Sequence, residues 1–89
     1  MNEQQFREEV AAEGYTIADI VTLSANKFND FHSHDFSAKL LILEGEITVT
    51  TKDGTATTCR ANDTFQLTAG IEHTEQVGPE GVRILPSRK

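Results

Sequence analysis

The residues best suited to carry chemistry in this sequence are its three histidines, His32, His34 and His73. His32 and His34 are two residues apart, so in a β-strand both imidazoles point to the same face, about 6.5–7 Å apart along the chain. Two rings at this spacing can approach one ion from one side, and His73 can reach it from an opposing wall. Three imidazoles with open positions can hold a transition metal and still accept a ligand. Taken alone, the His-x-His spacing also fits two histidines on an exposed edge strand.

Three further polar residues are candidates for the same pocket. Glu75 follows His73 by two residues, so in a regular strand its carboxylate faces the same way and can act as a fourth ligand or as a general acid or base. A bulge, or a place at the rim, would leave Glu75 in solvent, and this is the position that we favour. Gln66 and Thr68 are candidates for hydrogen bonds to a ligand near the mouth, although Thr68 can equally well only shape a turn.

The elements that must position these residues begin with one short helix. Asn2 can cap this helix, and Gln5, three residues later, can complete a capping box. Phe6 and Val10 share one face, and Gly14 supplies the stop. Because so short a helix is marginal alone, we expect Phe6 and Val10 to dock on the rest of the domain.

From Tyr15 onward the pattern changes to short β-type segments separated by turns. The continuous apolar run 40–43, in the segment 38–43, suits a strand buried on both faces, and Asp53-Gly54 is a strong hairpin turn. Many short strands without a second helix predict an all-β sandwich or closed barrel. The last residues, 87–89, look like a free tail. We expect extended segments at 15–23, 31–34, 38–43, 47–51, 55–60, 65–67, 73–77 and 82–85.

Composition limits the function classes. The 89 residues suffice for one domain with its own core. The 14 acidic and 8 basic residues give a net charge of −6, which repels phosphate backbones, so we expect no nucleic-acid partner. No apolar run is long enough for a membrane helix, and the polar N-terminus lacks the features of a secretory signal. The single cysteine, Cys59, excludes an internal disulfide, and we expect a cytoplasmic protein.

Two motifs, in order, resemble those of the cupin superfamily of RmlC-like barrels. The segment from His32-Ser33-His34 to Gly45 resembles the first motif, and the segment from Asn62-Asp63 through Thr68-Ala69-Gly70 to His73 resembles the second. The resemblance implies a cupin-type double-stranded β-helix, or jelly-roll barrel, with one short N-terminal helix. It also implies a metal site at the three histidines and a homodimer. The expected layout is a helix over 1–14, a barrel over 15–86 and a tail over 87–89.

The sequence departs from the cupin pattern where the family has a glutamate ligand, which falls at Ala38 or Lys39. Asn62 replaces a glycine, Thr68 a proline and Val77 an asparagine. A centre of three neutral imidazoles leaves the charge of a bound dication uncompensated, which favours an anionic further ligand. Thiol dioxygenases in the superfamily use a three-histidine iron centre, so the resemblance remains compatible with catalysis.

The resemblance therefore implies a stand-alone cupin that binds a divalent transition metal (iron, manganese, nickel or zinc) and a small anionic molecule. Such a protein can be a metal-dependent enzyme of the dioxygenase or isomerase type, and the fold does not select among these reactions. The alternatives are a non-catalytic module that senses or binds a small molecule, with or without metal, and a structural dimer whose histidines are remnants of a site.

Overall fold

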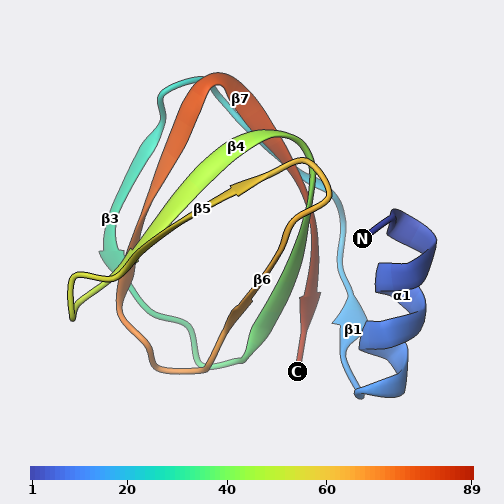
Figure 1. The fold of residues 1–89 in the computed structure, drawn as a ribbon. Coiled ribbons are helices and arrows are strands. Elements are labelled where there is room, and N and C mark those ends of the chain that lie inside the picture. The colour runs from blue at the N-terminus through green and yellow to red at the C-terminus, as the bar shows by residue number, and fades with distance from the viewer.

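The computed structural model describes residues 1–89, and it shows one helix beside an antiparallel sheet of seven strands that curls into a barrel (Figure 1). The two longest strands, β4 and β7, pair with each other, while β1, β2 and β3 pair with β7 and β5 and β6 pair with β4. The predicted all-β barrel with one N-terminal helix is confirmed. No helix is long and apolar enough to span a membrane. The elements are α1 (Glu3–Ala12), β1 (Thr16–Ile17), β2 (Val21–Leu23), β3 (Phe28–His32), β4 (Ala38–Thr51), β5 (Ala56–Arg60), β6 (Thr64–Leu67) and β7 (His73–Arg88).

The N-terminal helix forms as its sequence predicts. The Gln5 backbone N–H donates to Asn2 Oδ1 at 2.8 Å, and the Asn2 N–H donates to Gln5 Oε1 at 3.1 Å, which completes the capping box. Phe6 and Val10 are fully buried. The helix is therefore stabilised at its start by its own side chains and along one face by the barrel.

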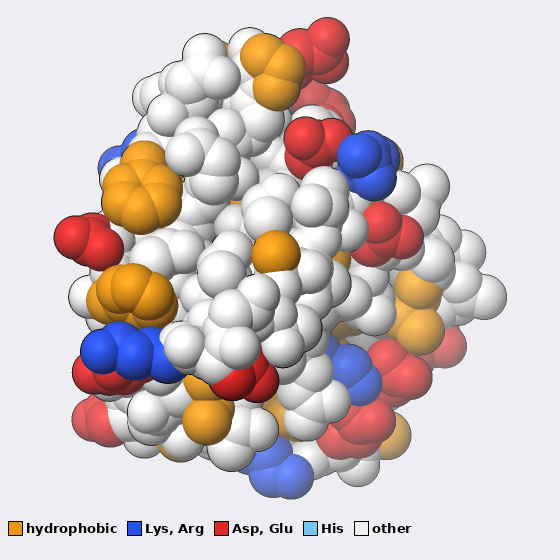
Figure 2. Space-filling view, turned by 60° about the vertical axis from the view of Figure 1, so that its left-hand side comes forward, with side chains coloured by type: hydrophobic (Ala, Val, Ile, Leu, Met, Phe, Trp, Pro, Cys, Tyr) orange, Lys and Arg blue, Asp and Glu red, His pale blue; other side chains and the backbone are white.

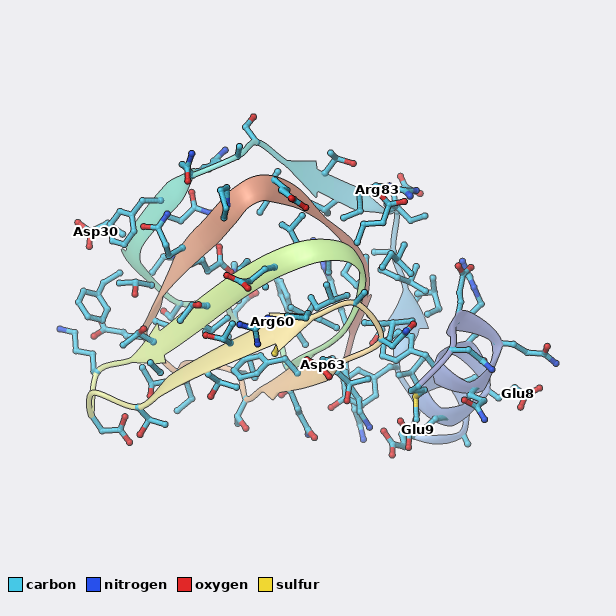
Figure 3. The ribbon with its side chains drawn as sticks, turned by 45° about the horizontal axis from the view of Figure 1, so that its top comes forward. Glu8, Glu9, Asp30, Arg60, Asp63 and Arg83 are labelled. Carbon is cyan, nitrogen blue, oxygen red and sulfur yellow. The ribbon has the colours of Figure 1, made fainter.

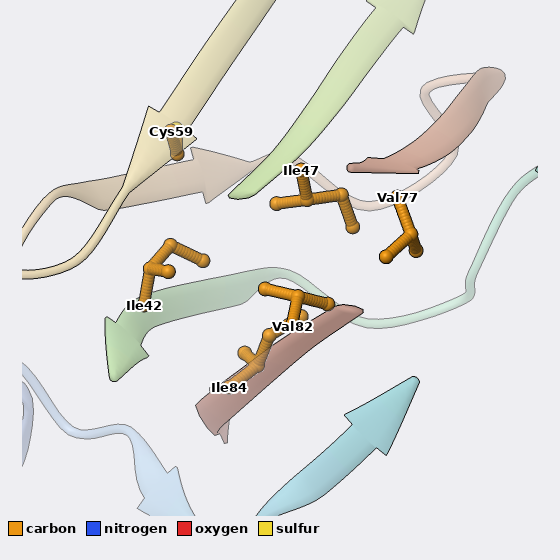
Figure 4. Close-up of a cluster of buried hydrophobic side chains, with 6 residues drawn as sticks. All are labelled: Ile42, Ile47, Cys59, Val77, Val82 and Ile84. Carbon is orange, nitrogen blue, oxygen red and sulfur yellow. The ribbon is translucent and has the colours of Figure 1, made fainter. Parts of the chain in front are cut away.

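Strand β4 has apolar residues on both faces because it lies between the barrel interior and α1. Leu41 pairs in register with Leu85, and both pack in a buried cluster with the helix. Ile42 pairs with Ile84, and both belong to a second cluster inside the barrel (Figure 4). The prediction of a strand buried on both faces is confirmed.

Each long strand bends once, where the sequence predicted a break between two strands. The register of β4 against β7 shifts on both sides of Gly45, so one strand continues through the bend. Gly45 and Gly81 both have positive φ, +80° and +79°, and a Cβ at Gly45 would lie only 1.9 Å from the Gly81 carbonyl oxygen. The two glycines thus let the backbones touch at the bend, and this closes one end of the barrel.

The expectation of a free tail at 87–89 is wrong. Strand β7 continues to Arg88 because β1 and β4 flank it, and Ser87 pairs with Ile17 and with Lys39. Ser87 is fully buried, and its hydroxyl donates to the Lys39 carbonyl at 2.8 Å. The Lys89 N–H donates to the Ser37 carbonyl at 2.8 Å, so the last residue is also tied to the barrel.

Candidate metal centre

The three histidines meet at the open end of the barrel. His32 ends β3, His73 begins β7, and these two residues are paired in register across the strands. His34 follows in the loop after β3. One nitrogen of each imidazole can be chosen so that all three lie within 4.8 Å of one another. The structure therefore brings together the three residues that the sequence singled out.

His34 reaches this point by a different route from the one predicted. Strand β3 ends at His32, so strand alternation does not place His34. Its carbonyl accepts a hydrogen bond from the Gly70 N–H at 2.8 Å, which ties its loop to the turn before β7. Its ring stacks on Phe36 with 4.9 Å between centroids and 23° between planes. A loop contact and an aromatic neighbour thus orient this imidazole.

Backbone carbonyls fix the tautomers of the other two rings. His32 Nδ1 lies 2.7 Å from the Asp30 carbonyl oxygen, and His73 Nδ1 lies 3.0 Å from the Ile71 carbonyl oxygen. A carbonyl oxygen only accepts hydrogen bonds, so both Nδ1 atoms carry the proton. The Nε2 lone pair of each neutral ring is therefore free to bind a metal, in the arrangement usual for histidine ligands.

Glu75 lies against the histidines, and not in the solvent position that we favoured from sequence. Its carboxylate oxygens lie 3.6 Å from His73 Nε2 and 3.9 Å from His32 Nε2. Asn29 Nδ2 donates to Glu75 Oε1 at 2.8 Å and helps to hold the carboxylate there. The Glu75 side chain is only 19% exposed. The strand is regular at this point, so Glu75 shares the face of His73.

The electrostatic surroundings favour the neutral form of His34. Burial lowers the pKa of His34, and repulsion by Arg88 and by the protonated forms of His32 and His73 lowers it further, while Glu75 acts in the opposite direction. A metal binds only the neutral imidazole, so a lowered pKa keeps this ring available at neutral pH.

Of the two positions at which the resemblance places a glutamate, Ala38 faces the cavity and Lys39 does not. Ala38 lines the cavity beside the histidines. Lys39 points to the outside, where its ammonium lies 2.9 Å from Glu13 and 3.2 Å from Glu9 of α1. The hydrogen bond to Glu13 is the main cause that raises the pKa of Lys39. A lysine therefore does not repel a metal here, and the carboxylate near the site comes from Glu75.

A cavity of about 150 Å³ adjoins the histidines. Phe65 and Leu67 line it, but Gln66 and Thr68 do not, so the prediction of these two residues as pocket candidates is wrong. Gln66 alternates with its neighbours and faces outward, where its Nε2 donates to the Tyr15 hydroxyl at 3.3 Å. The residues that line the cavity are Val21, His34, Phe36, Ala38, Leu40, Val49, Phe65, Leu67, His73, Glu75, Pro86, Ser87 and Arg88.

Three residues at the site were not predicted as site residues. Asn29 supports Glu75 from β3, but only the pairing of β3 with β7 reveals this. Phe36, two residues after His34, stacks on the His34 ring and lines the cavity. Arg88 lines the cavity, and its guanidinium carbon lies 4.4 Å from the Phe36 ring centre. The sequence carries no local signal for Arg88, because it lies in the segment that was predicted to be a tail.

The amino-acid sequence matches no known protein family, whereas the fold matches several solved structures. No family model matches the chain, and no curated protein matches it. A DUF861 family protein from Thermotoga maritima superposes with a TM-score of 0.74 at 22% identity, over 99% of this chain and 93% of that one.

Two solved cupins give similar superpositions over shorter stretches. A cupin superfamily protein from Desulfitobacterium hafniense DCB-2 has a TM-score of 0.68 at 17% identity, over 78% of this chain and 62% of that one. An RmlC-like cupin from Shewanella frigidimarina NCIMB 400 has a TM-score of 0.67 at 22% identity, over 78% of this chain and 60% of that one. The chain spans under two thirds of each.

These likenesses define the class of the fold. The chain has the fold of a small cupin-type domain, a jelly-roll barrel with one short helix. At these identities the likeness shows the fold alone, so the chemistry of the site must be argued from its own residues.

Proposed function

We propose that this domain binds a divalent transition metal through His32, His34 and His73 and presents it to a small anionic molecule in the adjoining cavity. The observation that carries the proposal is the gathering of three imidazoles whose nitrogens lie within 4.8 Å of one another. Two of these rings expose Nε2 because a backbone carbonyl holds Nδ1. His34 and His73 also line the cavity, so the site opens toward a ligand.

The donor set fits a transition metal. In a tetrahedral site, metal–nitrogen bonds of 2.0–2.1 Å place two ligand nitrogens about 3.3–3.4 Å apart. The nitrogens here are separated by up to 4.8 Å, so the imidazoles would have to move closer together to bind one ion. Imidazole ligands suit iron, nickel and zinc, and manganese also becomes acceptable when a carboxylate joins them.

Glu75 supplies the negative charge that Ala38 cannot. Its carboxylate faces the Nε2 atoms of His32 and His73, which is the side on which these rings would bind the ion. A bound metal would supply positive charge that polarises an oxygen of the ligand. Glu75 can offset part of this charge as a fourth ligand, or it can accept a proton from a molecule in the cavity.

Metal analysis tests the proposal directly. Protein purified without a histidine tag should contain, or take up, close to one metal ion per chain. The His73→Ala variant should lose this metal, whereas Gln66→Ala, which changes a polar residue outside the cavity, should keep it. Wild-type protein that is isolated without metal and refuses added iron, zinc, nickel and manganese contradicts the proposal.

Two classes of function remain for a metal-bound site, an enzyme and a binding module. Glu75 favours an enzyme of the dioxygenase or isomerase type, because it is the only carboxylate that lines the cavity and is placed to move a proton. Oxygen consumption and product formation with small thiols, diketones and hydroxy acids test for turnover. Ligand binding without turnover by metal-loaded protein identifies a non-catalytic module instead.

We also propose a cytoplasmic homodimer. Strand β3 pairs only with β7, so its other edge is open, and its Phe28 and Phe31 are 54% and 49% exposed. Figure 2, turned toward this side of the barrel, shows hydrophobic side chains between charged ones. A second copy can cover these aromatic residues about a two-fold axis. Light scattering should give roughly twice the chain mass of 9.8 kDa, and a monomer contradicts the dimer.

A further inference from the structure

Arg88 is the one Lys or Arg side chain that lines the cavity, and it has no carboxylate partner. None of the ion pairs in the structure includes it. Its guanidinium carbon lies 4.4 Å from the centre of the Phe36 ring, and Phe36 in turn stacks on the imidazole of His34. The protein thus places an unpaired positive charge at the cavity, one aromatic ring away from a histidine of the cluster.

The contact with Phe36 uses none of the hydrogen-bond donors of Arg88. A guanidinium has five N–H donors in its plane, and attraction to an aromatic ring does not consume them. The structure shows no hydrogen bond from the Arg88 side chain to another part of the chain. Two parallel N–H donors match the two oxygens of a carboxylate. Arg88 therefore has the geometry of an anion clamp that nothing in the protein occupies.

The rest of the cavity selects the body of the ligand. Besides Phe36 and Ala38, six apolar residues line it, and its volume of about 150 Å³ is close to that of an apolar protein cavity that accepts benzene. Glu75 is the one carboxylate in the lining, so it disfavours a second negative charge on the ligand. The six apolar residues of the lining are Val21, Leu40, Val49, Phe65, Leu67 and Pro86.

We propose that the cavity takes a compact monocarboxylate whose carboxylate is held by Arg88 and whose apolar body fills the space among the six apolar residues. The opposite end of such a molecule faces His73 and Glu75. Arg88 is then the residue that determines specificity, and it overcomes the repulsion of anions by a chain with a net charge of −6. This inference rests on the proposed function, because it names the ligand class of the same site.

A pair of probes with the same shape tests the inference. Benzoate and benzamide differ in charge but not in size, and their affinities can be measured by calorimetry or by amide chemical shifts. Wild-type protein should bind benzoate more tightly than benzamide. The Arg88→Gln variant should bind benzoate about tenfold more weakly or worse and benzamide unchanged, because a charged hydrogen-bonded pair is lost. Arg88→Lys keeps the positive charge but loses the two parallel N–H donors. Its affinity for benzoate should therefore lie between those of wild type and Arg88→Gln.

Arg83→Gln is the matched control. Arg83 lies on the same strand, but it points away from the barrel interior and pairs with Glu44 at 2.9 Å (Figure 3). Its replacement should leave both affinities unchanged. Equal binding of benzoate and benzamide by wild-type protein overturns the inference, and so do benzoate affinities that Arg88→Gln does not alter. Failure to bind benzoate, or inorganic phosphate bound as tightly as benzoate, also overturns it.

Metal-free and zinc-loaded protein are titrated separately, so that this inference and the proposed function can fail independently. Protein that takes none of iron, zinc, nickel and manganese but still prefers benzoate through Arg88 disproves the metal site and supports the role of Arg88 in carboxylate binding. Protein that binds zinc through the histidines but shows no preference disproves the clamp alone. Unchanged thermal unfolding of Arg88→Gln shows that a lost preference does not come from a misfolded strand end.

Discussion

The two ends of the barrel are built from the same two strands and differ in how their space is filled. At the bend of β4 and β7, six buried residues pack against one another (Figure 4), and the backbones touch at Gly45 and Gly81. At the opposite end, where both strands begin and end, a cavity of about 150 Å³ takes the place of a packed core. The polar side chains His73 and Glu75 enter the interior only at this end.

The comparison shows how a chain of 89 residues can sustain a polar cavity. Burial of apolar surface at the closed end stabilises the strands, and the helix adds a second buried cluster on their outer face. The strand ends are thereby held in place without a core of their own. Changes at the closed end should therefore cost stability, and changes at the open end should cost binding.

The largest effect on stability is expected at the bend. Gly45→Ala introduces a Cβ that would lie 1.9 Å from the Gly81 carbonyl oxygen, at a φ of +80°. We expect a loss of roughly 4 kcal/mol or more, or failure to fold. Gly54→Ala is the control, because its φ is also positive, +89°, but no atom would lie within 4 Å of the added methyl group. It should cost about 1–2 kcal/mol, as measured by chemical denaturation.

Truncation of a side chain inside the barrel should depend on the end at which it lies. Ile47 is 1% exposed in the packed cluster, so Ile47→Ala should lower the free energy of unfolding by about 3 kcal/mol. Leu67 is half-buried and already borders the cavity, so Leu67→Ala should cost only about 1–2 kcal/mol. Urea denaturation measures both free energies of unfolding. If Ile47→Ala and Leu67→Ala lower this free energy equally, the proposed difference between the two ends is wrong.

At the open end, Glu75→Gln should weaken metal binding about tenfold while leaving stability nearly unchanged. The variant keeps the shape of the side chain but removes the negative charge beside the histidines. Competition with a coloured chelator measures the affinity. The double variant Ala38→Glu with Glu75→Gln returns a carboxylate to the cavity from β4, and it should recover much of the loss. No loss with Glu75→Gln would show that this carboxylate does not assist the metal.

The smallest effect is expected for the ion pairs that fasten α1 to the outside of β4. Lys39→Met removes both of them and should cost up to about 1 kcal/mol at pH 7. Since the pKa of Lys39 is raised above 10.5 in the folded protein, this contribution is present below pH 10.5 and is lost as the pH rises through the folded value. Thermal unfolding should thus differ between wild type and variant at pH 9 and converge above the folded pKa. Lys27→Met, which removes a lysine without an ion pair, should show no such convergence.

The amino-acid sequence by itself determined the features that depend on near neighbours. The capping box of Asn2 and Gln5 needs only a four-residue segment, and Asn62 adopts the positive φ of 74° that its side chain tolerates. The three histidines could be predicted as metal ligands because imidazole commonly binds metals and because their spacing resembles a known pair of motifs. Burial of the run 40–43 on both faces also followed from its composition.

Only the tertiary structure decided which side chains face the cavity. Alternation along a strand says that Ala38 and Lys39 face opposite ways, but not which of them faces inward. That choice depends on α1, because Leu41 packs against Phe6 and Val10 of the helix and so places Lys39, two residues earlier, on the same outer face. Arg88 lies at the cavity because β1 and β4 extend β7 to its end, through contacts between residues far apart in the chain. Long-range pairing, and not local preference, therefore completes the site around the three histidines.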